Sequence, residues 1–287
     1  MDIVADPRDM QERAQQWRAQ GLSIAFVPTM GYFHQGHLSL MEYGRKVGDK
    51  VVVSLFVNPA QFGPAEDLDR YPRDLERDAA LARQVGVDVL FTPTAEQMYP
   101  PDYQTYVEVG DAAKGLCGVS RPGHFRGVAT VVCKLFNIVM PHTAIFGEKD
   151  YQQLVVIRRM AADLNLPVKV VGRPIVREED GLAMSSRNTY LSPEERRAAL
   201  CLQRALTAAR RLVSARKSSR EEILAVVQQV ISQTPHTRID YLALVDPETL
   251  AEVPAVRGEA RLALAVWVGN TRLIDNALLV ESKPCCV

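Results

Sequence analysis

The sequence lacks an excess of charge of either sign: its 287 residues include 34 Lys and Arg and 34 Asp and Glu, for a formal net charge of zero. Proteins that bind nucleic acid usually carry a basic excess, because they displace counterions from phosphates. The balance therefore argues against a nucleic-acid partner, although it leaves a local basic patch open. Hydrophobic residues make up 47% of the chain, which allows a sizeable core and disfavours disorder.

Cysteine is scarce, and long apolar runs are missing. The five cysteines are odd in number and form no Cys-x-x-Cys pair, so we expect neither a disulfide framework nor a zinc site. We assign no structural role to the adjacent pair Cys285 and Cys286 in the tail. No apolar run approaches the length of a membrane span, and the polar, acidic start is unlike a signal peptide. We expect a reduced, soluble, cytoplasmic protein with no membrane partner.

Three common signatures of catalytic and nucleotide-binding proteins are also missing. The chain has no Walker A lysine loop, no Gly-x-Gly-x-x-Gly fingerprint and no Gly-x-Ser-x-Gly elbow. Their absence argues against P-loop kinases, the usual dinucleotide-dependent dehydrogenases and α/β-hydrolases.

The first part of the sequence alternates apolar runs with segments of helical spacing. The apolar runs are those expected of strands buried on both faces: 22–29, 50–58, 87–93, 142–147 and 168–172. The helical segments between or beside them are 7–20, 37–47, 73–86, 125–140 and 150–164. Alternating strands and helices specify parallel βαβ units. Residues 1–175 are therefore predicted to form a Rossmann-like, doubly wound α/β domain.

The pattern changes after about Ile175. Two helices are expected at 192–213 and 219–233, and strands with partial alternation follow at 238–246, 261–269 and 271–279. Gly269 and Asn270 form a hairpin turn signal between the last two strands. Residues 176–287 are therefore predicted to form a smaller α+β domain.

Histidines in the segment PTMGYFHQGH (28–37) offer the sharpest chemical hypothesis. If a helix begins near Gly36, His37 lies at its N-terminus, where unpaired N–H groups and the helix dipole attract an anion. The same dipole disfavours a charged imidazole, so we expect neutral His37 to act by hydrogen bonding. A phosphate site, a turn shaped by Gly31 and Gly36, and a metal site remain as alternatives. The metal is least favoured, because the spacing of His34 and His37 is wrong and no third ligand is evident.

Two further clusters follow predicted strands, where ligands bind to open parallel sheets. The loop at 57–74 offers the amides of Asn58 and Gln61, but it is equally explained by ordinary turn chemistry. The segment FGEKDYQQL places Lys149 and Asp150 at a helix N-terminus, near a phosphate or its metal. There an acidic N-cap beside a solvated lysine is an equal alternative.

The last two clusters are weaker on the residues alone. VREEDGLAMSSRN (176–188) supplies hydroxyls and a cation suited to a triphosphate, but a Ser- and Asn-rich linker explains it better. In GHFRGV (123–128), His124 and Arg126 are expected to cap or brace the following helix rather than to contact a ligand.

Taken in order, the segments PTMGYFHQGHLSLM, FVNPAQF, GHFRGV, FGEKDYQQL and DGLAMSSRN resemble the pantothenate synthetase (pantoate–β-alanine ligase) family. The resemblance is dense from about Gly21 to Asn188 and continues by length and through DYLALVD. It implies membership of the nucleotidylyltransferase superfamily, a Rossmann-like domain, a C-terminal lid domain and a homodimer. The implied reaction joins (R)-pantoate to β-alanine with ATP through pantoyl adenylate, releasing AMP and pyrophosphate, in pantothenate and coenzyme A biosynthesis.

Site residues follow from the resemblance, position by position. It implies catalytic roles for His34, His37, Lys149 and Arg187. The implied ATP contacts are Met30, Gly31, Tyr32, Phe33, His34, Gln35, Gly36, His37, Gly147, Glu148, Lys149, Asp150, Val176, Met184, Ser185, Ser186 and Arg187. Gln61 and Gln153 are implied for pantoate, Gln61 also for β-alanine, and Phe62 and Met30 for the dimethyl carbon of pantoate. ATP is implied as a substrate together with Mg²⁺, for which Asp78 is a weaker candidate ligand.

Two departures from the related motifs are visible. Phe33 stands where leucine usually precedes the first histidine, which should change packing only. The related synthetases use a Lys-Met-Ser-Lys-Ser loop, whereas both lysine positions here are Ala183 and Ser186, so the cationic role must fall to Lys149 and Arg187. An adenylyltransferase acting on a phosphate ester and a non-catalytic nucleotide-binding protein remain as alternative functions.

Overall fold

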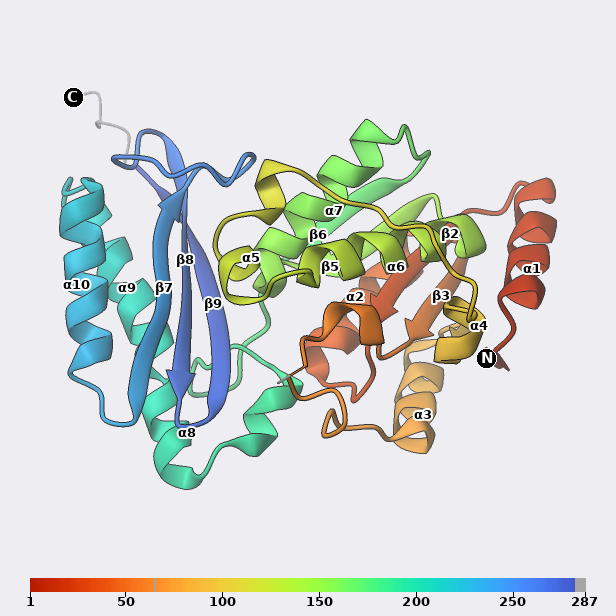
Figure 1. The fold of residues 1–287 in the computed structure, drawn as a ribbon, viewed down its shortest axis with the longest axis horizontal. Coiled ribbons are helices and arrows are strands. Elements are labelled where there is room, and N and C mark those ends of the chain that lie inside the picture. Colours follow the sequence, from red (N-terminus) through yellow and green to blue (C-terminus); the bar gives the residue numbers. More distant parts are fainter. Residues whose placement is uncertain (65, 282–287) are drawn as a thin grey trace. The chain divides into compact units, whose positions relative to one another are not determined.

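The computed structural model describes residues 1–64 and 66–281; Cys285 and Cys286 lie outside them. The chain forms two compact units (Figure 1). The first unit comprises Met1–Glu148 and Gln153–Pro174, and the second comprises Lys149–Gln152 and the chain from Ile175 onward. The boundary after Pro174 lies one residue from the predicted one. The prediction did not anticipate that Lys149–Gln152 belong to the second unit.

Within the described residues, the first unit contains a six-stranded parallel sheet with the order β1-β4-β3-β2-β5-β6. Its strands are β1 (Asp2–Val4), β2 (Ile24–Thr29), β3 (Lys50–Leu55), β4 (Val89–Phe91), β5 (Thr143–Gly147) and β6 (Lys169–Arg173). The order reverses direction at β2, which pairs with β3 on one side and β5 on the other. Ligands of open α/β sheets bind beyond the carboxyl ends of the strands at such a switch point.

Helices cover this sheet on both faces. The helices in this part of the chain are α1 (Pro7–Ala19), α2 (Gln35–Val47), α3 (Leu75–Val85), α4 (Ala95–Met98), α5 (Cys117–Ser120), α6 (His124–Val139) and α7 (Tyr151–Asp163), and α1, α2 and α6 contact β2 directly. Short 3₁₀ turns are η1 (Pro59–Gln61), η2 (Asp111–Ala113) and η3 (Glu148–Asp150). Alternate residues of β2 face opposite layers, as the two-residue period of a strand requires. Ala25 and Val27 pack with Met41 of α2, whereas Phe26 meets the ring of Phe136 in α6 edge-on at 6.5 Å.

The second unit is an α+β layer. Its antiparallel sheet has the order β7-β8-β9, from β7 (Thr237–Val245), β8 (Glu259–Val268) and β9 (Thr271–Val280). The remaining elements are η4 (Ser186–Tyr190), α8 (Pro193–Ala199), α9 (Cys201–Ser214) and α10 (Arg220–Ser232). Its core combines small and branched side chains of α9, α10 and β8: Ala205, Leu206, Ala209, Ile223, Val227, Ile231, Leu262, Leu264 and Val266. The two-residue turn predicted at Gly269 and Asn270 is confirmed.

One strand was not predicted, and two local predictions were wrong. The N-terminal residues form the edge strand β1, which is only three residues long and buries only Val4, too little for a visible pattern. Strand β3 ends at Leu55, because Asn58 caps the turn η1. The single helix expected at 192–213 is two helices that meet at Leu200, where ψ is −11° instead of about −42°.

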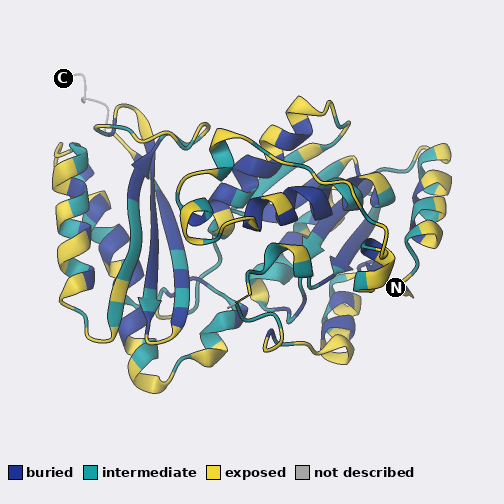
Figure 2. Ribbon diagram, viewed as in Figure 1, coloured by how far each residue is buried: buried dark blue, intermediate teal, exposed yellow. Residues whose placement is uncertain are grey.

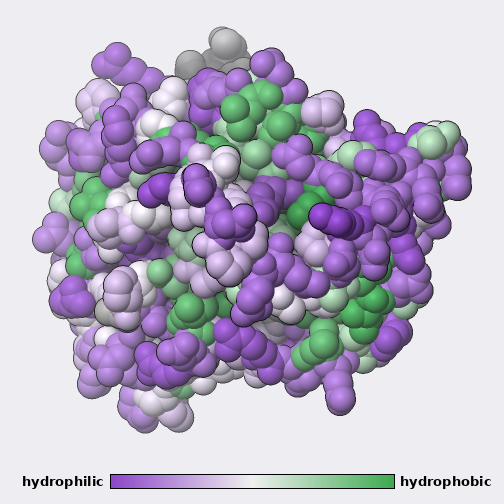
Figure 3. All heavy atoms as spheres, turned by 45° about the vertical axis from the view of Figure 1, so that its right-hand side comes forward, coloured by the Kyte–Doolittle hydropathy of each residue, from purple (hydrophilic) through white to green (hydrophobic). Residues whose placement is uncertain are grey.

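Burial follows this layering. The strands and the inner faces of the helices are buried, whereas exposed residues gather on the outer helix faces and loops (Figure 2). Hydrophilic residues cover most of the face in Figure 3, and hydrophobic residues appear there in small separate groups. Among the described helices, none combines the length and apolar character needed to cross a bilayer.

Candidate nucleotide site

The histidine loop leaves β2 at the switch point of the sheet. Gly31 and Tyr32 both have positive φ, +89° and +55°, and together they reverse the chain into α2. A residue other than glycine is strained in this left-handed conformation, so other contacts must hold Tyr32 there. The helix begins at Gln35, one residue before Gly36, near which it was predicted to begin, and His34 is its N-cap.

The two imidazoles of the loop cap the helix themselves. The backbone N–H of Gly36 donates to Nδ1 of His34 at 3.1 Å, and the backbone N–H of His34 donates to Nδ1 of His37 at 3.4 Å. A nitrogen that accepts a hydrogen bond carries no proton, so each neutral ring carries its hydrogen on Nε2. The ring centroids lie 4.1 Å apart with the planes tilted by 36°, a proximity that two charged imidazoliums would oppose. Both histidines are therefore set to donate from Nε2 beside a helix N-terminus.

Asp78 of α3 holds the reversed loop. Its side chain is 1% exposed, and its two oxygens accept the backbone N–H groups of Tyr32 at 2.6 Å and Phe33 at 2.7 Å. Burial raises the pKa of this carboxyl, and the two hydrogen bonds oppose the rise only in part. Because both oxygens already accept N–H groups, the contacts do not favour the Mg²⁺ role predicted for Asp78, and they assign it to the loop.

Arg77 completes this support from the same helix. Its guanidinium donates to the carbonyl of Phe33 at 2.8 Å and lies over the ring of Tyr32, 5.0 Å from the centroid. The side chains of α3 thus hold the N–H groups, a carbonyl and a ring of the loop. Sequence reasoning missed this support, because a charged pair on an amphipathic helix reads as a solvated face.

Gln61 lies at the end of η1, next to the histidine loop. Its Nε2 donates to Sδ of Met30 at 3.1 Å, and its Oε1 accepts from Nδ2 of Asn58 at 3.2 Å. Asn58 is itself buried and accepts the Tyr99 hydroxyl at 2.8 Å. The structure therefore brings together a residue predicted for ATP and one predicted for pantoate, and it fixes which way the Gln61 amide faces.

Arg121, which precedes α6, and His124, the first residue of α6, both contact the backbone carbonyl of Gln61. Nδ1 of His124 lies 2.8 Å from the Gln61 carbonyl, so this side chain contacts η1, whereas the predicted role was to cap or brace the helix that follows. Arg121 donates to the same carbonyl at 3.3 Å and forms two hydrogen bonds with Glu66, at 2.7 and 2.5 Å. Burial alone would raise the pKa of Glu66, but the hydrogen bonds and charge of Arg121 outweigh it and lower that pKa.

Gly127 lets the backbone of α6 approach η1. A Cβ added there would lie 2.1 Å from the carbonyl oxygen of Ala60 and 2.7 Å from the nitrogen of Gln61. The Gly127 carbonyl also accepts Nδ2 of Asn58 at 3.2 Å. The glycine of GHFRGV thus has a packing role that only a residue without a side chain fulfils.

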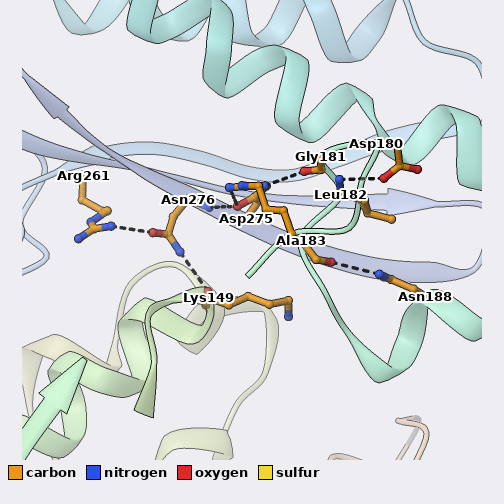
Figure 4. Close-up of polar contacts among 10 residues, drawn as sticks. Lys149, Asp180, Gly181, Leu182, Ala183, Asn188, Arg261, Asp275 and Asn276 are labelled. Atoms are coloured by element: carbon orange, nitrogen blue, oxygen red, sulfur yellow. Dashed lines mark hydrogen bonds and ion pairs between the residues drawn. The ribbon is translucent and has the colours of Figure 1, made fainter. Parts of the chain in front are cut away.

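The chain passes from the first unit into the second just after β5 and returns four residues later. Gly147 and Glu148 belong to the first unit, as does Gln153, whereas Lys149 and Asp150 belong to the second. The carbonyl of Lys149 accepts Nδ2 of Asn276, a buried residue of β9, at 3.0 Å (Figure 4). Sequence reasoning did not single out Asn276, because one amide within a strand gives no pattern.

The loop predicted to close over the nucleotide is a small closed turn of the second unit. Arg177 and Ala183 form an antiparallel bridge, and the N–H of Met184 donates to the carbonyl of Val176 at 3.0 Å. Ser185 caps η4 by accepting the N–H of Arg187 at 3.3 Å. Val176 and the stretch from Met184 to Arg187 therefore form one ordered segment, in which Ser186 is buried.

An open parallel sheet with a histidine-capped helix at its switch point defines a nucleotide-binding α/β protein. A family model described as pantoate-beta-alanine ligase matches residues 2–278. The chain belongs to the pantoate-beta-alanine ligase family.

Named relatives agree with this membership. The chain is 56% identical over 281 residues to the pantothenate synthetase of Syntrophus aciditrophicus, covering 98% of each chain. It is 58% identical over 281 residues to that of Syntrophotalea carbinolica, covering 98% of this chain and 99% of the relative.

Solved structures are similar over nearly the whole chain. A crystal structure of pantothenate synthetase from Thermus thermophilus has a TM-score of 0.91 and 50% identity, covering 96% of this chain and 99% of that one. The pantoate-beta-alanine ligase of Francisella tularensis, complexed with beta-gamma ATP and beta-alanine, has a TM-score of 0.79 and 32% identity, covering 97% of both chains.

Proposed function

We propose that the chain joins (R)-pantoate to β-alanine with consumption of ATP, giving pantothenate, AMP and pyrophosphate through pantoyl adenylate. One observation supports this location of the reacting site. Nδ1 of His34 and Nδ1 of His37 both accept backbone N–H groups. The pair presents two Nε2 donors at the start of α2, beside the switch point of the sheet. Family membership and the ligand-bound relative from Francisella tularensis support ATP and β-alanine as substrates.

The first step activates a poor electrophile. The pantoate carboxylate attacks the α-phosphorus of ATP, and pyrophosphate leaves with the electrons of the broken phosphoanhydride bond. Negative charge grows on the phosphoryl oxygens, so catalysis is mostly positioning and charge stabilisation. Nε2–H of His34 and of His37, with the N-terminal N–H groups of α2, donates to those oxygens. Lys149 and Arg187 supply positive charge to the triphosphate.

The remaining ATP contacts come from segments described above. We propose that the backbone and side chains of the histidine loop and of the two loops around Lys149 and Arg187 surround the nucleotide. The proposed contacts are Met30, Gly31, Tyr32, Phe33, Gln35, Gly36, Gly147, Glu148, Asp150, Val176, Met184, Ser185 and Ser186.

The second step forms the amide bond. The β-alanine amine attacks the acyl carbon of the adenylate, the acyl–oxygen bond breaks, AMP leaves with the electrons of that bond, and the proton lost by the amine nitrogen passes to water. We propose that Gln61 and Gln153 hold pantoate and that Gln61 also contacts β-alanine. The contacts of Gln61 with Met30 and Asn58 support this role, because they fix its amide before any substrate arrives.

Other expectations remain part of the proposal. Mg²⁺ would be held mainly by the phosphates of ATP and by water, as is common for magnesium in nucleotide sites, and would neutralise part of the triphosphate charge. We further propose that the second unit acts as a lid, that the protein forms a homodimer and that it works in the cytoplasm. Light scattering on purified protein at micromolar concentration tests the dimer: a mass near 31.9 kDa would contradict it.

The deciding experiment supplies ATP, Mg²⁺, pantoate and β-alanine and follows AMP and pantothenate. Exchange of pyrophosphate into ATP that needs pantoate but not β-alanine is expected from the two-step order. A protein that binds ATP yet forms no AMP is a nucleotide-binding protein without this activity. Adenylyl transfer to a phosphate ester in place of pantoate would assign it to an adenylyltransferase instead.

A further inference from the structure

Two adjacent buried polar residues in β9 contact both segments of the second unit that carry proposed ATP contacts. Asp275 is 2% exposed and Asn276 is 4% exposed. Polar groups at such depth destabilise a fold unless they are fully hydrogen-bonded. Figure 4 shows that their hydrogen bonds run in two directions, toward Lys149 and toward the loop that contains Gly181 and Ala183.

The first direction starts at Asn276. Its Oδ1 accepts Nη1 of Arg261 at 2.9 Å, which forces its Nδ2 to face the Lys149 carbonyl, 3.0 Å away. The guanidinium of Arg261 lies over the ring of Tyr151, 3.7 Å from the centroid. The Tyr151 hydroxyl donates to the carbonyl of Pro247 at 3.0 Å. The segment Lys149–Gln152 is therefore tied to the rest of its unit through Asn276, Arg261 and Pro247.

The second direction starts at Asp275. Its two carboxylate oxygens accept Nη1 and Nη2 of Arg177, at 2.7 and 2.9 Å. Nη1 of Arg177 also donates to the carbonyl of Gly181 at 3.0 Å, across the turn that the bridge with Ala183 closes. A two-point pair between a guanidinium and a carboxylate fixes orientation as well as distance. The base of the loop that leads to Arg187 is thereby held against β9.

We infer that Asp275 and Asn276 are positioning residues that hold the segments of Lys149 and Arg187 in one fixed arrangement. The inference rests on the proposed function, in which these two side chains meet the phosphates of ATP. Because both segments are hydrogen-bonded to neighbouring residues of β9, the side chains of Lys149 and Arg187 are already arranged as a pair when the nucleotide binds. Prior arrangement spares the ordering cost that two independent loops would incur at each turnover.

The sharpest variant is Asn276→Asp. It keeps the shape of the side chain and an oxygen for Arg261, but it replaces the donor to Lys149 with a second oxygen. We expect the rate of pantoyl adenylate formation to fall about tenfold or more and KM for ATP to rise, as a lost buried hydrogen bond implies. Attack of β-alanine on preformed adenylate should keep its rate. Asp275→Asn, which breaks half of the pair with Arg177, should act in the same direction.

The matched control is Asp240→Asn. Asp240 pairs with Arg272 of β9 at 2.7 Å and is partly buried, with 17% of its side chain exposed, but this pair joins β9 to β7. It reports what a lost ion pair in the same sheet does to the enzyme. Equal losses of adenylate formation in Asp240→Asn and Asn276→Asp would overturn the inference.

A double-mutant cycle gives the second criterion. If Asn276 acts through Lys149, then Asn276→Asp should cause little further loss of activity or ATP-analogue affinity in a Lys149→Ala background. Full additivity of the two changes would overturn the inference. The same cycle between Asp275→Asn and Arg187→Ala tests the other segment.

Hydrogen–deuterium exchange separates this inference from the proposed function. Peptides spanning 147–153 should exchange faster in Asn276→Asp, and peptides spanning 176–188 faster in Asp275→Asn, with neither change in Asp240→Asn. Unchanged exchange would overturn the positioning role. Failure of the unaltered protein to form AMP with pantoate would instead overturn the proposed function and leave the exchange result standing. If Asp275→Asn does not fold, Asn276→Asp decides alone, because it removes one hydrogen bond.

Discussion

The carboxylate of Asp78 accepts the backbone N–H of Tyr32 at 2.6 Å, across 46 positions of sequence, where the chain is in the left-handed conformation. The hydrogen bond compensates for that conformation and sets the direction in which the chain enters α2. The position of His34 and His37 therefore depends on a residue of another helix. Two consequences for Asp78 can be measured.

Asp78→Asn should slow adenylate formation by about 10- to 100-fold, the range for a small misplacement of reacting groups. The amide offers one oxygen to two N–H donors and turns its NH₂ group toward the other. Pre-steady-state measurement of AMP-linked pantoate gives the rate. Full activity of the variant, together with an unchanged histidine loop in its crystal structure, would exclude this role.

The same residue predicts a pH dependence of stability. Burial raises the pKa of Asp78 above 3.8, so its contribution to stability is full below pH 3.8 and is lost as the pH rises through the folded-state pKa. Asp78→Asn cannot ionise, so this decline should be missing from its free energy of unfolding. The free energy of unfolding of the two proteins is compared by urea unfolding at pH values from about 3.5 to about 7, in steps of about half a unit.

His37→Gln should separate capping from catalysis. Glutamine at the third helical position completes a capping box, so the free energy of unfolding should change by only about 0.5 kcal/mol. The Nε2 donor is lost from its place, so adenylate formation should slow by roughly two to three powers of ten. His37→Ala loses both roles and serves as the comparison. Equal activity of His37→Gln and the unaltered enzyme in single-turnover assays would remove His37 from the mechanism.

The Glu66–Arg121 pair should stabilise the fold at neutral pH and less so in acid. Arg121 lowers the pKa of Glu66 below 4.5, so the pair's contribution is present above pH 4.5 and is lost as the pH falls through the lowered value. Because both side chains are shielded from solvent, roughly 1 kcal/mol is expected. Glu66→Gln should lower the free energy of unfolding by that amount at pH 7. It should also weaken the fall of this free energy as the pH drops below 4.5. Identical pH profiles for both proteins would show that the pair contributes nothing.

Gly127→Ala should displace Gln61. The added methyl would lie 2.1 Å from the Ala60 carbonyl oxygen, a distance that real contacts do not show. We expect a rise in KM for pantoate and a loss of about 1–3 kcal/mol of stability, typical of overpacking. Gly115→Ala is the control, since a Cβ there meets nothing within 4 Å and the residue is not in the left-handed region. A normal KM in Gly127→Ala would mean that η1 moves without consequence for Gln61.

Much of the fold could be predicted from the sequence because its signals are local. Buried strands gave continuous apolar runs, and Gly269 with Asn270 marked a hairpin. The differences lie where the local signal is weak: a three-residue edge strand that was not predicted, and a helix interrupted at Leu200 by a change of one dihedral angle.

The site was predictable only in part, for a related reason. Histidines, glycines and lysines near strand ends are visible as residue types, and the resemblance assigned them roles. The residues that position them cannot be recognised in this way, because Asp78, Arg121 and Asn276 contact backbone atoms 45 to 127 positions away. Backbone atoms are the same at every residue, so no pattern of side chains records which of them a distant carboxylate or amide will contact.

The passage of Lys149–Gln152 through the C-terminal unit makes the chain indivisible by a single cut. A break after Pro174 would leave Lys149 and Tyr151 on one fragment and their partners Asn276, Arg261 and Pro247 on the other. Each fragment would expose polar groups that are satisfied only by the other. The two pieces should therefore be stable as a reassembled pair rather than as separate proteins, and splitting the gene here would yield mutually dependent products.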